Sequence, residues 1–194
     1  GYKTVKMTPA IVQVKTSNEL TRQLKGIKVN AEASLYRNKK LLRKEIGEVL
    51  FCDYGLSGPP ILQLSRFADR EQGLKISLDI MPEISVLELE KMLKTRDENL
   101  SYRTIEEFFT GLINKRLGQV ILKKCGYGLS DSVLKIKDTN KIAETIKNLE
   151  FEVISTTGFD NSQVTAGGLK TSQFSCKKKK KKKDRNLYCI GEIL

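Results

Sequence analysis

Apolar and polar residues alternate in the first part of the chain and again near its end, which predicts strands in both places. The clearest case is residues 74–80, Leu-Lys-Ile-Ser-Leu-Asp-Ile, where every second residue is apolar. Residues 38–40 have the composition of a hairpin tip, with its turn type open. Shorter stretches predict further strands at residues 10–15, 27–36, 41–42, 48–51, 150–156, 163–165 and 187–190.

The apolar spacing changes to a helical period between residues 81 and 149. Ser85 with Glu88, and Thr104 with Glu107, fit the capping box that satisfies free N–H groups at the start of a helix, and a glycine at 126 fits a helix end. Helices are expected at residues 86–95, 105–110, 112–124 and 141–148.

Two more helices are expected among the early strands. One follows the Gly-Pro-Pro turn at about residues 59–68, because proline is tolerated in the first turn of a helix. The other is short and ends near residue 24, with Ser17 or Asn18 as its cap. The order of strands, helices and strands predicts an α+β fold in which a helical subdomain interrupts a β-rich frame, since neither set of strands could bury its apolar face alone.

Charge is concentrated near the end of the chain. The formal net charge is +12, but seven consecutive lysines fill residues 177–183, and without them 28 Lys and Arg residues face 23 Asp and Glu residues, a balance of +5. No aromatic residue lies within the lysine run to stack on bases, so nucleic acid is not the expected partner. The alternative is a binding module that holds nucleic acid or another polyanion through these lysines.

Other features of the composition narrow the chemistry. Histidine is absent, which excludes histidine-assisted nucleophiles and histidine-ligated metals. The four cysteines form no C-x-x-C pair, which indicates reduced thiols in a cytoplasmic protein. No apolar run reaches the roughly 18 residues of a membrane span, so no membrane partner is expected. Strand-like sequence at both ends suggests a fragment of a longer protein.

The segment Gly55-Leu-Ser-Gly-Pro59 resembles a nucleophile elbow, but that pattern requires glycine where Pro59 stands. A strand-to-helix turn with Ser57 as the helix cap is therefore expected. Glu48 and Asp53 lie near this turn, where they are either an acid–base pair or carboxylates without a catalytic role. The pattern leaves both interpretations open.

A longer stretch that contains this turn carries a family resemblance. Residues 47–65, GEVLFCDYGLSGPPILQLS, resemble the signature G-E-x-L-F-T-x-x-G-L-S-G-P-x-I-L-Q-L-S of the HI0933-like (BaiN/YhiN) flavoproteins, which are NAD(P)/FAD-dependent oxidoreductases. Residues 9–12, PAIV, 163–168, QVTAGG, and 187–194, LYCIGEIL, resemble further segments of the family. The lysines fall where the family has a T-M-E-S segment.

This resemblance implies a domain plan. Residues 1–80 and 150–166 would form a small β-barrel, residues 81–149 its inserted helical subdomain, and residues 167–194 the return toward an FAD-binding domain. The module would cover the flavin and shape access for a small-molecule substrate, while NAD(P)H and the rest of the FAD domain complete the enzyme. The resemblance gives four residues a cofactor-contact role: Gly167, Gly168, Gly191 and Glu192. No G-x-G-x-x-G occurs in the sequence, so FAD is not expected to be held by this chain alone.

Overall fold

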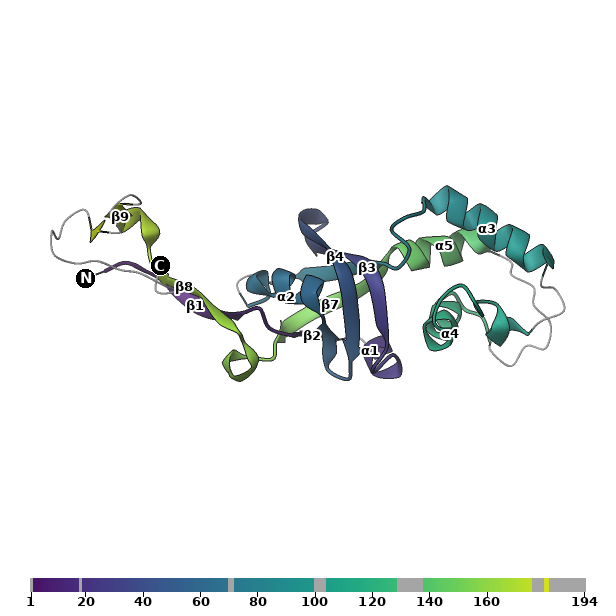
Figure 1. The fold of residues 1–194 in the computed structure, drawn as a ribbon, viewed down its shortest axis with the longest axis horizontal. Coiled ribbons are helices and arrows are strands. Elements are labelled where there is room, and N and C mark those ends of the chain that lie inside the picture. Colours follow the sequence, from purple (N-terminus) through teal and green to yellow (C-terminus); the bar gives the residue numbers. More distant parts are fainter. Residues whose placement is uncertain are drawn as a thin grey trace.

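The structure is a computed structural model, which describes residues 2–17, 19–69, 72–99, 104–128, 138–175 and 180–181. Three parts follow one another along its long axis: a two-stranded ribbon, a β-barrel and a group of helices (Figure 1). The α+β class predicted from the sequence, a small barrel module with an inserted helical subdomain, is confirmed. The predicted domain boundaries stay a prediction.

Six strands close into the barrel in the order β2-β5-β4-β3-β6-β7, and all neighbours are antiparallel. Every second side chain of a strand points into the barrel, and on β6 these are the buried residues Leu74, Ile76 and Leu78. The rings of Phe51 and Phe151, both fully buried, lie 6.0 Å apart in this core. The strands are β2 (Val14–Thr16), β3 (Lys28–Arg37), β4 (Lys40–Cys52), β5 (Gly55–Ser57), β6 (Leu74–Asp79) and β7 (Leu149–Thr156).

Two short helices pack against the barrel. Helix α1 (Leu20–Gln23) begins after Glu19, which makes no side-chain capping bond, so Ser17 is not its N-cap residue. The alternative cap, Asn18, lies outside the described residues. Helix α2 (Pro59–Leu64), extended by the 3-10 turn η1 (Ser65–Phe67), begins after Gly58. No side chain caps α2 either, so the predicted cap role of Ser57 is also wrong.

The helical subdomain leaves the barrel after β6 and returns at β7. It contains α3 (Val86–Asn99), η2 (Ile105–Glu107), α4 (Lys115–Lys124) and α5 (Thr139–Lys147). Both predicted capping boxes are present. Helix α4 is shorter than predicted because Asn114 caps it, accepting from the N–H groups of Arg116 and Leu117, and Gly126 ends it with φ 95°.

The subdomain is anchored to the barrel at its point of entry and exit. The Lys147 Nζ lies 2.7 Å from Asp79 Oδ2 and donates to the carbonyl oxygens of Met81 and Ile84. One continuous apolar core then joins barrel residues such as Leu78 to helical residues. Among the described residues, no helix is long and apolar enough to cross a membrane.

The ribbon joins β1 (Thr4–Ala10) to β8 (Val164–Leu169) in antiparallel register. The predicted strand at residues 10–15 is split, because Ile11 turns the chain with φ 50° and sends β1 away from the barrel. The remaining elements are η3 (Phe159–Asn161), η4 (Thr171–Gln173), β9 (Phe174–Ser175) and β10 (Lys180–Lys181). The predicted strand at residues 187–190 lies outside the described residues.

Candidate functional site

The signature segment at residues 47–65 has a structural role that its glycines explain. A Cβ on Gly55 would lie 2.1 Å from the Val14 carbonyl oxygen, and one on Gly58 would lie 2.2 Å from the Glu48 carbonyl oxygen. Both glycines have positive φ. The two glycines thus allow the backbones of β5 and β2, and those of α2 and β4, to pack in direct contact. Close packing explains why the segment has glycine at these positions.

The polar residues of the segment do not form a catalytic pair. Glu48 lies 2.9 Å from Lys28, and Asp53 lies 2.7 Å from Lys25, with about half of each carboxylate side chain exposed. The hydrogen bond from Lys25 lowers the pKa of Asp53 below its ordinary value. Both carboxylates are therefore held in exposed ion pairs with lysines and not against each other.

Two of the four predicted cofactor residues lie in the ribbon. Gly167 and Gly168 belong to β8, where Gly168 is paired with Val5 of β1. A Cβ on Gly167 would lie 2.3 Å from the Lys6 carbonyl oxygen, so the approach of β1 already requires glycine there. The other two, Gly191 and Glu192, lie outside the described residues. A cofactor role for all four stays a prediction.

The described residues do not by themselves fit FAD. The space beside Gly167 that a cofactor could use is filled by the backbone of β1. The glycine-rich strand-to-helix turn that binds a pyrophosphate is absent from the sequence. Among the described residues, no group of acidic or cysteine side chains could hold a metal ion. The expectation that this chain alone does not hold FAD stays a prediction.

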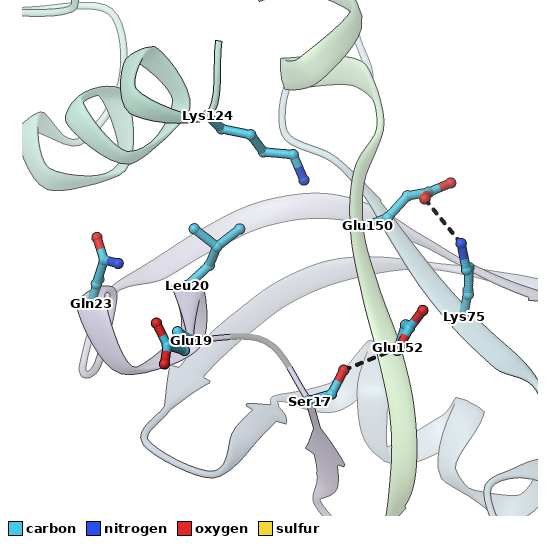
Figure 2. A pocket seen from close by; sticks show the side chains of 8 residues that line it. All are labelled: Ser17, Glu19, Leu20, Gln23, Lys75, Lys124, Glu150 and Glu152. Carbon is cyan, nitrogen blue, oxygen red and sulfur yellow. Dashed lines mark hydrogen bonds and ion pairs between the residues drawn. The ribbon is translucent and has the colours of Figure 1, made fainter. Parts of the chain in front are cut away.

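Gly168 and Leu169 line a hollow of about 380 Å³ together with residues 4–7 of β1. Two larger hollows lie on the outer face of β6 and β7. One hollow of about 500 Å³, here called the α1 hollow, opens between α1, β7 and the end of α4. Figure 2 shows Lys124 extending from α4 toward Glu150, while Glu19 and Gln23 line the opposite wall. Glu152 closes the floor, where it accepts a 3.4 Å hydrogen bond from Ser17.

A second hollow of about 560 Å³, here called the hairpin hollow, lies under the tip of the β3–β4 hairpin. Lys75 and Glu150 line both hollows, and their ion pair, at 3.5 Å, separates them. Tyr36, Asn38 and Asn148 give the hairpin hollow an aromatic ring and two side-chain amides. The α1 hollow combines three carboxylates with two lysines, so it does not favour anions; the hairpin hollow suits a planar polar group.

Sequence reasoning missed both hollows. Their residues come from strands, turns and helices that are far apart in the sequence. In the α1 hollow, Ser17 and Glu152 are 135 positions apart, and the hairpin hollow joins Tyr36 to Glu150. No spacing along the chain connects them, and most of their side chains are charged residues of a kind common on any surface. The one local signal is the basic composition of the hairpin tip, residues 36–44, Tyr-Arg-Asn-Lys-Lys-Leu-Leu-Arg-Lys.

Comparison with curated proteins finds a reductase and two dihydrouridine synthases among the relatives of this chain. The 3-dehydro-bile acid delta(4,6)-reductase of Clostridium scindens is 27% identical over 200 residues, which cover 100% of this chain and 49% of that protein. The ribosomal RNA dihydrouridine synthases of Escherichia coli and Haemophilus influenzae are 26% and 27% identical, over 75% and 76% of this chain and 36% of each relative. The chain spans about half, or less, of the length of these relatives.

The family comparison agrees with the signature residues. Residues 8–164 match the family described as the HI0933-like protein barrel and H2TH domain. The match begins within β1 and ends at the first residue of β8, so it contains the whole barrel and the helical subdomain. The resemblance identified from residues 47–65 is confirmed, and the chain belongs to the HI0933-like family.

Proposed function

We propose that this chain is the domain of an FAD-dependent oxidoreductase that covers the flavin and shapes access for the substrate. The observation that carries the proposal is the similarity to a reductase over the full length of the chain. Membership of the HI0933-like family, a flavoprotein family, supports FAD as the cofactor of the longer protein. NAD(P)H is the proposed source of reducing equivalents.

The names of the relatives suggest a substrate class. A delta(4,6)-reductase of a 3-dehydro-bile acid acts on carbon–carbon double bonds conjugated with the 3-oxo group. Dihydrouridine is uridine whose C5=C6 bond, conjugated with the C4 carbonyl, has been reduced. Each reduction formally adds a hydride and a proton across a carbon–carbon double bond that is conjugated with a carbonyl group. We propose the same class, a conjugated carbonyl compound, as the substrate here.

The residues of this chain would bind, orient and shield, and the cofactor would supply the hydride chemistry. Histidine is absent from the sequence, and Glu48 and Asp53 are in exposed ion pairs, so we assign neither carboxylate a proton-transfer role. A closed barrel suits a covering domain, because a sheet without free edges holds its shape when a substrate enters or leaves. The glycine contacts of residues 47–65 add to that rigidity.

Expression of the complete open reading frame tests this proposal. The purified protein should show flavin absorbance, and anaerobic NADH or NADPH should bleach it. Reoxidation of the reduced protein should then follow addition of a conjugated enone and should fail with the saturated ketone of the same skeleton. A colourless protein whose frame also encodes no G-x-G-x-x-G would refute the flavoenzyme proposal. Reoxidation at the same rate by both ketones would refute the substrate class.

A further inference from the structure

We infer that the tip of the β3–β4 hairpin and the hairpin hollow form a binding site for single-stranded RNA. The tip, residues 36–44, carries five basic residues and no acidic one. Arg37, Lys39, Lys40, Arg43 and Lys44 are all exposed. The site does not include the lysine run at residues 177–183. RNA would then be the substrate of the proposed reductase, and this step rests on the proposed function.

The charges at the tip differ in how far they are neutralised. Arg43 is paired with Glu45 and Lys44 with Glu32, so these two charges are neutralised by nearby carboxylates. Among the residues that the structure describes, no carboxylate forms an ion pair with Lys39 or Lys40. Unneutralised lysines on a projecting hairpin are suited to phosphate contacts, because they reach a polyanion without first breaking an internal pair.

The backbone holds the two lysines in a fixed direction. Asn38 and Lys39 have φ values of 46° and 67°, which form a two-residue turn of the primed type between Arg37 and Lys40. The hairpin tip thereby projects from the barrel as a twisted extension of β3 and β4 (Figure 1). A rigid turn lowers the entropy lost when its side chains contact a ligand.

The hollow beside these lysines supplies the groups that recognise a base. Tyr36 is half-buried and lines the hollow together with Asn38 and Lys39. Asn148, the residue between α5 and β7, also lines the hollow, and its side-chain carbonyl oxygen accepts a hydrogen bond from the Ser77 hydroxyl. An aromatic face can stack on a base, and amides can bond its edge, while lysines hold the adjacent phosphates.

The dimensions and the chemistry favour an unpaired strand. A hollow of about 560 Å³ is large enough for a nucleotide but is too small for a duplex. A base can enter it only when the base is unstacked, as in a loop or a single strand. Two of the relatives act on ribosomal RNA by name, which favours RNA over other polyanions.

The test is the binding of a fluorescein-labelled, unstructured uridine-rich RNA of about 12 nucleotides to the 194-residue chain, followed by anisotropy over a series of salt concentrations. The double variant Lys39→Gln/Lys40→Gln should lower the slope of log K against log salt by about 1.4, from two phosphate contacts at about 0.7 each. Tyr36→Leu should weaken binding roughly tenfold and leave that slope unchanged, since stacking carries no net charge.

Two controls make the outcome decisive. Lys91→Gln/Lys123→Gln removes the same charge from exposed positions on α3 and α4 and should leave affinity and slope unchanged. Replacement of part of the lysine run by the family's residues, K178T/K179M/K180E/K181S, should leave the effects of the hairpin variants intact. Unfolding midpoints equal to that of the wild type establish that each variant is folded.

Three results would overturn the inference: hairpin variants that bind like the α3/α4 control, loss of all binding with the lysine run, or an unchanged affinity in Tyr36→Leu. The measurement requires neither flavin nor turnover. Failure of RNA binding is therefore distinguishable from failure of the proposed function. The flavin spectrum of the longer protein tests the proposed function separately.

Discussion

Replacement of Gly58 by alanine should destabilise the chain by more than the cost of its backbone conformation. Gly58 has φ 99° and ψ 160°, a region almost confined to glycine, where another residue costs about 1–3 kcal/mol. A Cβ there would lie 2.2 Å from the Glu48 carbonyl oxygen. Since non-bonded atoms of this kind prefer separations above about 3 Å, α2 or β4 must move by about 1 Å.

The cost of that movement follows from what α2 buries. Pro60, Ile61 and Leu64 are its buried residues, and burial of apolar side chains of this size contributes about 2 kcal/mol each, or about 6 kcal/mol together. A gap of about 0.5–1 Å forfeits a quarter to a half of the contact energy. The clash should therefore add about 1.5–3 kcal/mol to the conformational cost.

Gly158 offers a matched control. Its φ of 92° and ψ of −179° place it in the same region of backbone conformation, but no heavy atom lies within 4 Å of a Cβ built on it. Urea unfolding followed by far-UV circular dichroism should show Gly58→Ala to be less stable than Gly158→Ala by about 2 kcal/mol, or by about 4–8 °C in Tm. Equal losses in the two variants would refute the steric reasoning.

Three other predictions concern charge and burial. Lys147→Met should lower the free energy of unfolding by about 3 kcal/mol, because it leaves the largely buried Asp79 carboxylate without its cation; a urea-unfolding loss below about 1 kcal/mol would contradict this. Hydrogen bonds from Ser85, which caps α3, lower the pKa of Glu88. The ionised Glu88 side chain therefore stabilises the fold fully above its unfolded pKa, and this stabilisation is lost as pH falls through its folded pKa. The urea midpoint of the wild type should accordingly fall more than that of Glu88→Gln between pH 6 and pH 3, and parallel falls would contradict the linkage. Burial raises the pKa of Cys125, so iodoacetamide should label it more slowly than the partly exposed Cys52 in a peptide map; equal rates would contradict the burial argument.

The sequence predicted those parts of the fold that rest on local patterns. The strand at residues 74–80 and both capping boxes appear as expected, because alternation and capping depend on neighbours within a few residues. The long strand β4 was predicted only as two short pieces, since much of its outer face is charged and its apolar signal is weak. The break at Ile11 has no glycine or proline to announce it.

The candidate site was less predictable than the fold. The carboxylates near residue 53 were visible in the sequence, but only the geometry shows them in exposed ion pairs. Tyr36 and Asn148 meet across the hairpin hollow because β3 pairs with β6 and β6 with β7. Such a meeting depends on long-range register, which a single sequence does not encode in any local pattern.

The place of β7 in the barrel has a consequence for folding during synthesis. β7 lies between β6 and β2, so the sheet has two open edges until residues 149–156 have left the ribosome. Those edges must stay unpaired while the 69 residues from 80 to 148 are made. Closure joins β2 to β7 across more than 130 positions, a separation that slows folding and prolongs the time in which another chain could pair with the open edges.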